Sequence, residues 1–98
     1  IAMAGSPDPA WEPLVRQAVL RLAADYRAEA KEPTGRITHV KGLAWGALLA
    51  AQTFGPGRLE QEARELRSAV SEWPDEEPRK SALDLVDLYL AGKPLPES

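Results

Sequence analysis

Apolar residues recur at intervals of three and four along four stretches of the chain, and prolines and glycines separate these stretches. Such spacing places apolar side chains on one side of an α-helix. The first stretch begins at Pro9 or Pro13 and ends near residue 31. Its apolar positions are Trp11, Leu14, Val15, Ala18, Val19, Leu22 and Tyr26. We therefore expect a first amphipathic helix that buries one face.

Two later stretches have the same character. The stretch over 58–72 has a narrow apolar seam, and the stretch over 76–91 has a wider one. The seam positions are Leu59, Ala63, Leu66, Val70 and Trp73 in the former and Ala82, Leu85, Val86 and Tyr89 in the latter. Both stretches predict helices with one apolar and one charged side.

The stretch over 36–54 is different, because apolar residues surround almost the whole helix. Its main face consists of Ile37, Val40, Ala44, Ala47, Leu48 and Ala51, whereas Leu43, Trp45 and Leu49 lie elsewhere on the wheel. A helix that is apolar nearly all round is usually central. Gly42, Gly46 and Ala50 recur every four residues and form a strip without bulk. Each glycine costs about 1 kcal/mol of helix propensity relative to alanine, so we expect another backbone to approach there.

These patterns predict an all-α fold, a small antiparallel four-helix bundle with a central apolar helix over 36–54. The 98 residues suit one domain. We expect residues 1–6 to be an expression scar, residues 7–92 to form a single helical domain, and residues 93–98 to be a flexible C-terminal tail in which Leu95 can pack.

Composition indicates the class of protein, its cellular compartment and the kinds of partner to expect. Hydrophobic residues make up 44% and charged residues 28%, which is typical of a globular domain. The chain has no cysteine, which excludes disulfides and thiolate metal sites and favours the cytoplasm. Eight arginines against four lysines, with abundant alanine, indicate a bacterial source. The longest apolar run, Leu43–Ala51, is far short of a membrane span. A net charge of −3 makes nucleic acid an unexpected partner.

The only histidine, His39, opens a short motif with Lys41 and Gly42. The motif resembles the phosphoacceptor site of histidine phosphotransfer domains, which are also four-helix bundles. In that family two residues separate His from Lys-Gly, whereas here only one does. Residues two apart on a helix differ by about 200°, so Lys41 and His39 point to nearly opposite sides. A partly exposed histidine near a helix start is the simpler interpretation.

Two pairs of acidic residues form a candidate metal site. Glu62 and Glu65, followed by Asp84 and Asp87, provide oxygen ligands of the kind that Mg²⁺ prefers. Their arrangement is similar to that of all-α nucleotide pyrophosphohydrolases of the MazG type, which carry Glu-x-x-Glu and then Glu-x-x-Asp. The resemblance implies a metal-dependent activity. On the predicted helices, however, Glu65, Asp84 and Asp87 point away from the apolar faces, which predicts a solvated charged surface.

We therefore expect a small helical protein–protein interaction module, whose partner is another protein or a second copy of itself. The predicted surface comprises Gly42, Leu43, Trp45, Gly46, Leu49 and Ala50. We predict no catalytic residues and no cofactor, because the chain has one histidine, no cysteine and no nucleophile elbow. The alternative is a metal-dependent pyrophosphohydrolase-like or small-ligand domain, with His39 and Lys41 at the ligand site. Trp11 and Trp73 are expected in the core.

Overall fold

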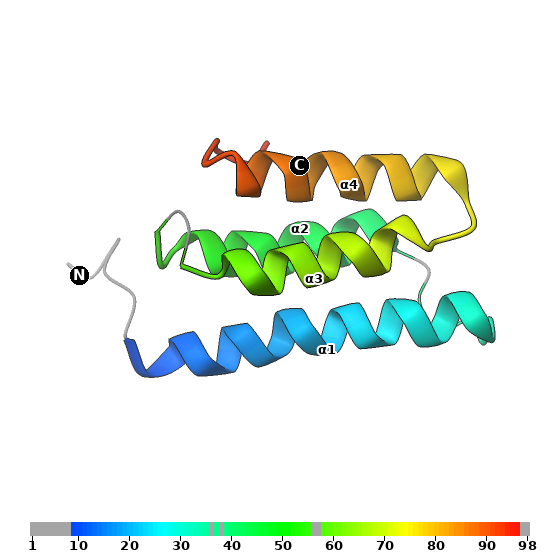
Figure 1. Cartoon of the computed structure of the whole chain (residues 1–98), viewed down its shortest axis with the longest axis horizontal. Coiled ribbons are helices and arrows are strands. Elements are labelled where there is room, and N and C mark those ends of the chain that lie inside the picture. The colour runs from blue at the N-terminus through cyan, green and yellow to red at the C-terminus, as the bar shows by residue number, and fades with distance from the viewer. Residues whose placement is uncertain (1–8, 36, 38, 56–57, 97–98) are drawn as a thin grey trace.

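The computed structural model describes residues 9–35, 37, 39–55 and 58–96, which form four α-helices (Figure 1). The elements are a 3-10 turn η1 (Pro9–Trp11) and the helices α1 (Glu12–Lys31), α2 (Val40–Gln52), α3 (Glu60–Ser71) and α4 (Glu76–Leu90). Consecutive helices run in opposite directions, and no strand occurs in the described ranges. The predicted all-α four-helix bundle is therefore confirmed. Residues 1–6, 97 and 98 lie outside the described residues.

The helix ends follow the prolines and glycines. The expected start of the second helix at Arg36 lies outside the described residues, and α2 itself begins at Val40. It ends before residue 54, because Thr53 and Phe54 form a turn that Gly55 closes with a φ of 101°. A positive φ of this kind favours glycine. After α4, Gly92 has a φ of 75°, and the amide of Lys93 donates to the Leu88 carbonyl. This bond closes the helix in the manner of a Schellman cap.

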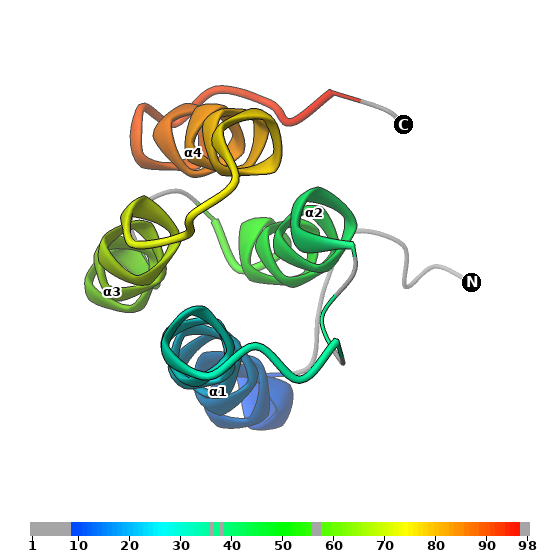
Figure 2. The same cartoon turned by 90° about the vertical axis from the view of Figure 1, so that its right-hand side faces the viewer.

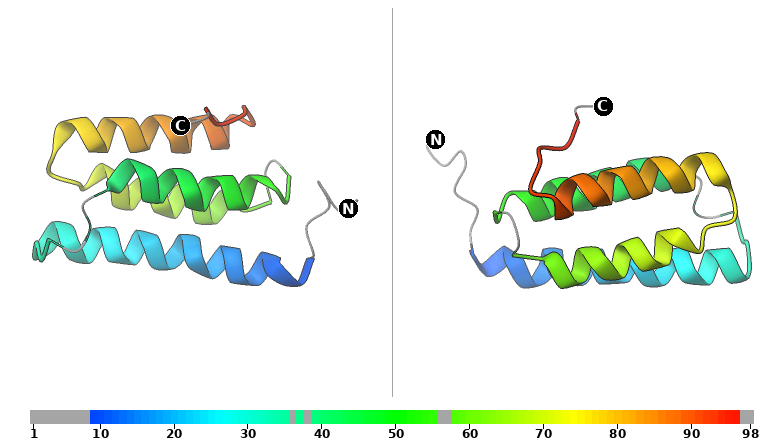
Figure 3. Two further views of the ribbon diagram at one scale, coloured as in Figure 1. Left: turned by 180° about the vertical axis from the view of Figure 1, so that it is seen from behind. Right: turned by 45° about the horizontal axis from the view of Figure 1, so that its top comes forward.

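The helices are not arranged around the bundle in chain order. α1 packs against α2 and α3, and α4 also packs against α2 and α3. The second and third helices therefore lie across one diagonal, and the first and fourth lie across the other (Figure 2). Despite its apolar composition, α2 has only two close neighbours, α1 and α4. Seen from behind, it lies in front between them (Figure 3). One side of α2 is consequently covered by no other helix.

The core lies on the inward faces that the sequence predicts for α2, α3 and α4. Its fully buried large side chains are Val19, Tyr26, Leu48, Leu59, Leu66, Val70 and Val86. The rings of Tyr26 and Trp73 meet with centroids 5.7 Å apart and planes tilted by 60°, a geometry that aromatic pairs favour. The Tyr26 hydroxyl donates to the carbonyl oxygen of Val40 at 2.6 Å. This bond joins α1 to the first residue of α2.

The predicted face of α1 is wrong at its beginning. Trp11 is 63% exposed and Leu14 is 69% exposed, so neither belongs to the core. The buried arc instead centres on Val19 and Ala23. At about 100° per residue, the five helical steps from Leu14 to Val19 rotate Leu14 roughly 140° away from Val19. Trp11 and Leu14 have helical spacing with the residues that follow, but they lie on a flank of the helix and not on its buried side.

Membrane insertion receives no support from the helices. Within the described ranges, none of them combines the length and the apolar character that crossing a bilayer requires.

The two tyrosines of the chain give a prediction for alkaline solution. Burial raises the pKa of both Tyr26 and Tyr89 above the ordinary value, because an ionised phenolate loses hydration inside the protein. In the unfolded chain they ionise near pH 10, at about the model-peptide value. Stability should therefore be complete below that pH and fall as the pH rises beyond it. We expect tyrosinate absorbance to develop together with loss of helical circular dichroism. Tyrosinate forming near pH 10 in a fully helical protein would contradict the burial of both rings.

Candidate functional site

The outer side of α2 contains an open strip of small and apolar residues. Gly42 and Gly46 are exposed, and Leu43 is 44% exposed. A Cβ atom added at Gly46 would meet nothing within 4 Å, and one at Gly42 would meet only the Cβ of His39 at 3.8 Å. The expected close approach of another backbone is therefore not made at these glycines by the described part of the chain. We call Gly42, Leu43 and Gly46 the open strip.

The other flank of the predicted surface contacts the C-terminal segment. The Trp45 indole Nε1–H donates to the Pro96 carbonyl at 2.7 Å, and Leu95 is buried. Trp45, Leu49 and Ala50 are half-buried. Figure 2 shows the segment leaving α4 and crossing towards the side of α2. The predicted surface thus comprises the open strip, Trp45 in contact with the C-terminal segment, and the half-buried Leu49 and Ala50.

The alternative ligand residues do not line the hollow beside α1. His39 is exposed immediately before α2, and Lys41 is exposed in its first turn. An open hollow of about 630 Å³ lies beside α1 and the connection to α2. The lining residues are Arg21, Asp25, Ala28, Glu29, Lys31, Glu32, Thr34 and Ile37, and they include neither His39 nor Lys41.

Glu29, which lines this hollow, is a buried carboxylate that the sequence reasoning missed. It accepts hydrogen bonds from the Thr34 amide at 3.0 Å, the Gly35 amide at 2.8 Å and the Thr34 hydroxyl at 2.5 Å. The hydroxyl bond is the main cause that lowers the pKa of Glu29, and the amides contribute to the same shift. Its place three residues after Tyr26, on the buried side of α1, was an available signal. The carboxylate holds the connection to α2 in place, so it is committed to structure.

The four acids of the alternative metal site do not form a cluster. Glu62 pairs with Arg16 at 3.3 Å, Glu65 pairs with Arg27, and Asp87 pairs with Arg67 at 2.6 Å, whereas Asp84 is exposed on α4. Across the described ranges, no three histidine, cysteine or acidic side chains come together in a way that could hold a metal ion. Three of the four carboxylates thus face guanidinium groups.

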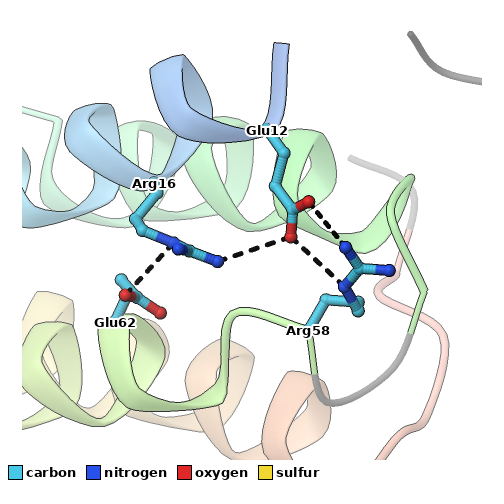
Figure 4. A network of polar contacts seen from close by, with 4 residues as sticks. All are labelled: Glu12, Arg16, Arg58 and Glu62. Atoms are coloured by element: carbon cyan, nitrogen blue, oxygen red, sulfur yellow. Dashed lines mark hydrogen bonds and ion pairs between the residues drawn. The ribbon is translucent and has the colours of Figure 1, made fainter. Parts of the chain in front are cut away.

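A polar network ties the beginnings of α1 and α3 together (Figure 4). Arg58 donates to both oxygens of Glu12, at 2.7 and 3.2 Å, and Arg16 lies between Glu12 and Glu62 at 3.4 and 3.3 Å. Both carboxylates are largely buried, with side chains only 13% and 14% exposed. Two acids and two arginines balance in charge. The network therefore fastens helix ends and leaves no unpaired carboxylate for catalysis.

Comparison with known proteins gives no family for the chain. No protein-family model matches it, and neither a curated protein nor a solved structure matches. Function must therefore be inferred from its own residues. Three of the four predicted metal-site acids are paired with arginines, whereas the outer side of α2 presents exposed apolar side chains.

The network predicts a difference between two glutamates. Replacing Glu12 with Gln leaves Arg58 and Arg16 without their shared carboxylate and should destabilise the fold by about 1–2 kcal/mol, because the lost bonds are charged and partly buried. Glu60→Gln removes a carboxylate that bonds Arg64 on an exposed helix surface and should cost under about 0.5 kcal/mol. Urea unfolding of both variants measures the contrast. Equal losses would show that the network contributes no more than a surface pair.

Proposed function

We propose that this chain is a helical protein–protein interaction module that self-associates through the outer side of α2. The proposal rests on the near absence of charged residues from this helix. Lys41 is the one charged residue in the thirteen of α2. α3, by contrast, places charged residues along its outward side. An outward helix side without charge, bearing an exposed leucine, is typical of a surface that becomes covered.

A second copy fits the open strip because the strip is complementary to itself. Leu43 projects beside Gly46, three residues further along the same side of the helix. A twofold axis brings the same patch of both copies together, so Leu43 of one copy can occupy the space over Gly46 in the other. Glycine permits the two backbones to approach closely. This use would offset the cost of an exposed glycine within a helix.

Covering Leu43 supplies a modest part of the free energy of association. Burying a whole leucine side chain contributes about 1.5–3 kcal/mol. Leu43 retains 44% of its exposure, so covering it contributes roughly 1 kcal/mol in each copy on that scale.

We do not advance the pyrophosphohydrolase-like alternative, because three of its four acids are paired with arginines. A cytoplasmic, bacterial setting stays part of the proposal and depends only on the cysteine-free, arginine-rich composition.

Sedimentation equilibrium over a range of concentrations tests the proposal. The native chain should form a dimer as its concentration rises, and Leu43→Glu should weaken this association at least tenfold, because it places a charge in the contact. Leu20→Glu is the matched control. Leu20 is 40% exposed but lies on α1 between Arg16 and Arg27, which contact α3. A native chain that stays monomeric throughout, or a control that weakens association equally, would contradict the proposal.

Gly46→Ala separates association from folding in the same experiment. Its new methyl group meets nothing within the described chain, so the monomer should gain about 0.5–1 kcal/mol from helix propensity. The same methyl group would obstruct a close approach of two helices. We expect unfolding to require more urea while dimerisation weakens. If both properties improve, the glycine is not at the contact.

A further inference from the structure

The C-terminal segment over 93–96 acts as an arm that docks against α2. The Trp45 indole and the Gln52 side-chain amide donate to the carbonyls of Pro96 and Lys93, at 2.7 and 3.3 Å. Between these two bonds Leu95 is buried to 9% exposure, in contact with the core. We call residues 93–96 the arm. Its docking site lies beside α2 and the end of α4, where a small hollow of about 240 Å³ is lined by Gln52, Tyr89, Gly92 and Pro94.

The chemistry of this contact is that of an extended-peptide site. Pro94 and Pro96 have no amide hydrogen and a fixed φ, so the arm requires few hydrogen-bond acceptors and loses little conformational freedom on docking. The site offers two side-chain donors to backbone carbonyls and a place for one leucine. No charged side chain forms either bond. A second copy of the chain has the same C-terminal residues, so its arm can make the same contacts at this docking site.

The junction with α4 allows the arm to change direction. The end of the helix is completed by the amides of Gly92 and Lys93, which donate to the carbonyls of Tyr89 and Leu88. Gly92 has a φ of 75°, which these two bonds require and which glycine adopts without a side-chain penalty. A rotation about the Cα–C bond of Lys93, beyond the last of these bonds, releases the arm without breaking a hydrogen bond of α4.

We propose that two copies exchange arms, so that the arm of each docks against α2 of the other. This inference rests on the proposed self-association and deepens it. Four residues span at most about 14 Å, so an exchanging copy must lie directly against α2. Trp45 and Gly46 point about 100° apart around α2, so the docking site and the open strip lie on adjacent sides of the same helix. A second copy that covers the open strip therefore comes close enough to α2 for an arm to reach it.

Exchange is favoured by concentration, because the contacts are the same in both states. Within one chain, the short connection gives the arm a high effective concentration at its own site. Between two chains, the same hydrogen bonds and the same buried leucine form twice, and only the freedom of the second molecule is lost. Contact between the open strips offsets that loss. The closed monomer should therefore prevail in dilute solution and the exchanged dimer in concentrated solution.

Complementation between two defective copies tests the exchange. One copy, isotopically labelled, carries Leu95→Asp and so has an intact docking site but a defective arm. The other, unlabelled, carries Trp45→Phe and has an intact arm. The readout is the nuclear magnetic resonance signal of the Trp45 indole N–H in the labelled copy. Among the signals of the three tryptophans, it is identified by its loss in labelled Trp45→Phe.

In labelled Leu95→Asp alone, the Trp45 signal should leave its native position. Adding unlabelled Trp45→Phe should return it towards that position as the concentration rises. The unlabelled double variant Trp45→Phe/Leu95→Asp, which has no intact arm, should leave the signal unmoved. Leu95→Ala replaces Leu95→Asp if circular dichroism shows that the acidic variant does not fold.

The outcomes distinguish the two proposals. If Trp45→Phe does not restore the signal although the native chain dimerises in sedimentation, arm exchange is overturned and the pairing of open strips stands. If the native chain never dimerises, both are overturned. Restoration by Trp45→Phe, but not by the double variant, supports exchange. Leu95→Asp should then also weaken dimerisation of the chain at least tenfold.

Discussion

The structure depends on the mismatch between the apolar circumference of α2 and the two neighbours that cover it. In a bundle of four, each helix has two close neighbours and keeps an outward side. α3 has the exposed ion pair of Glu60 and Arg64 on its surface, whereas Lys41 is the one charged residue of α2. The outward side of α2 therefore lacks the charged residues of α3. Glycines lie on one flank of this side, and the chain's own C-terminal segment packs against the other. The unusual chemistry of the molecule is therefore concentrated on one helix.

Elsewhere the polar groups are used to hold the bundle together. Tyr26 fixes the beginning of α2, Glu29 holds the preceding connection, and Glu12 joins α1 to the approach to α3. Buried polar groups that have partners rigidify a fold, and they are not free to bind other molecules. Because these polar groups already bond one another, they favour a function at the protein surface over one in a catalytic pocket.

Local patterns predicted the elements and most of the core, and long-range pairing limited the rest. Leu66, Leu85 and Val86 are buried as their helical spacing predicts. Trp11 was misassigned because its place on the wheel lies at the edge of the buried arc, which depends on how α1 is rotated against its neighbours. The contact between Trp45 and Pro96 spans 51 positions. Nothing in the local sequence of Trp45 or Pro96 indicates that the two residues meet. The sequence therefore predicted that Trp45 belongs to the candidate surface, but it did not predict that the C-terminal segment contacts it.

One measurement addresses the mismatch directly. A soluble paramagnetic agent broadens the methyl signals of side chains that solvent reaches, so Leu43 and the buried Leu48 of the same helix can be compared at low and high protein concentration. The Leu43 signal should be broadened in dilute solution and protected in concentrated solution, while the Leu48 signal should be protected in both. A Leu43 signal that is protected even in the dilute monomer, or that is equally broadened at both concentrations, would contradict this prediction.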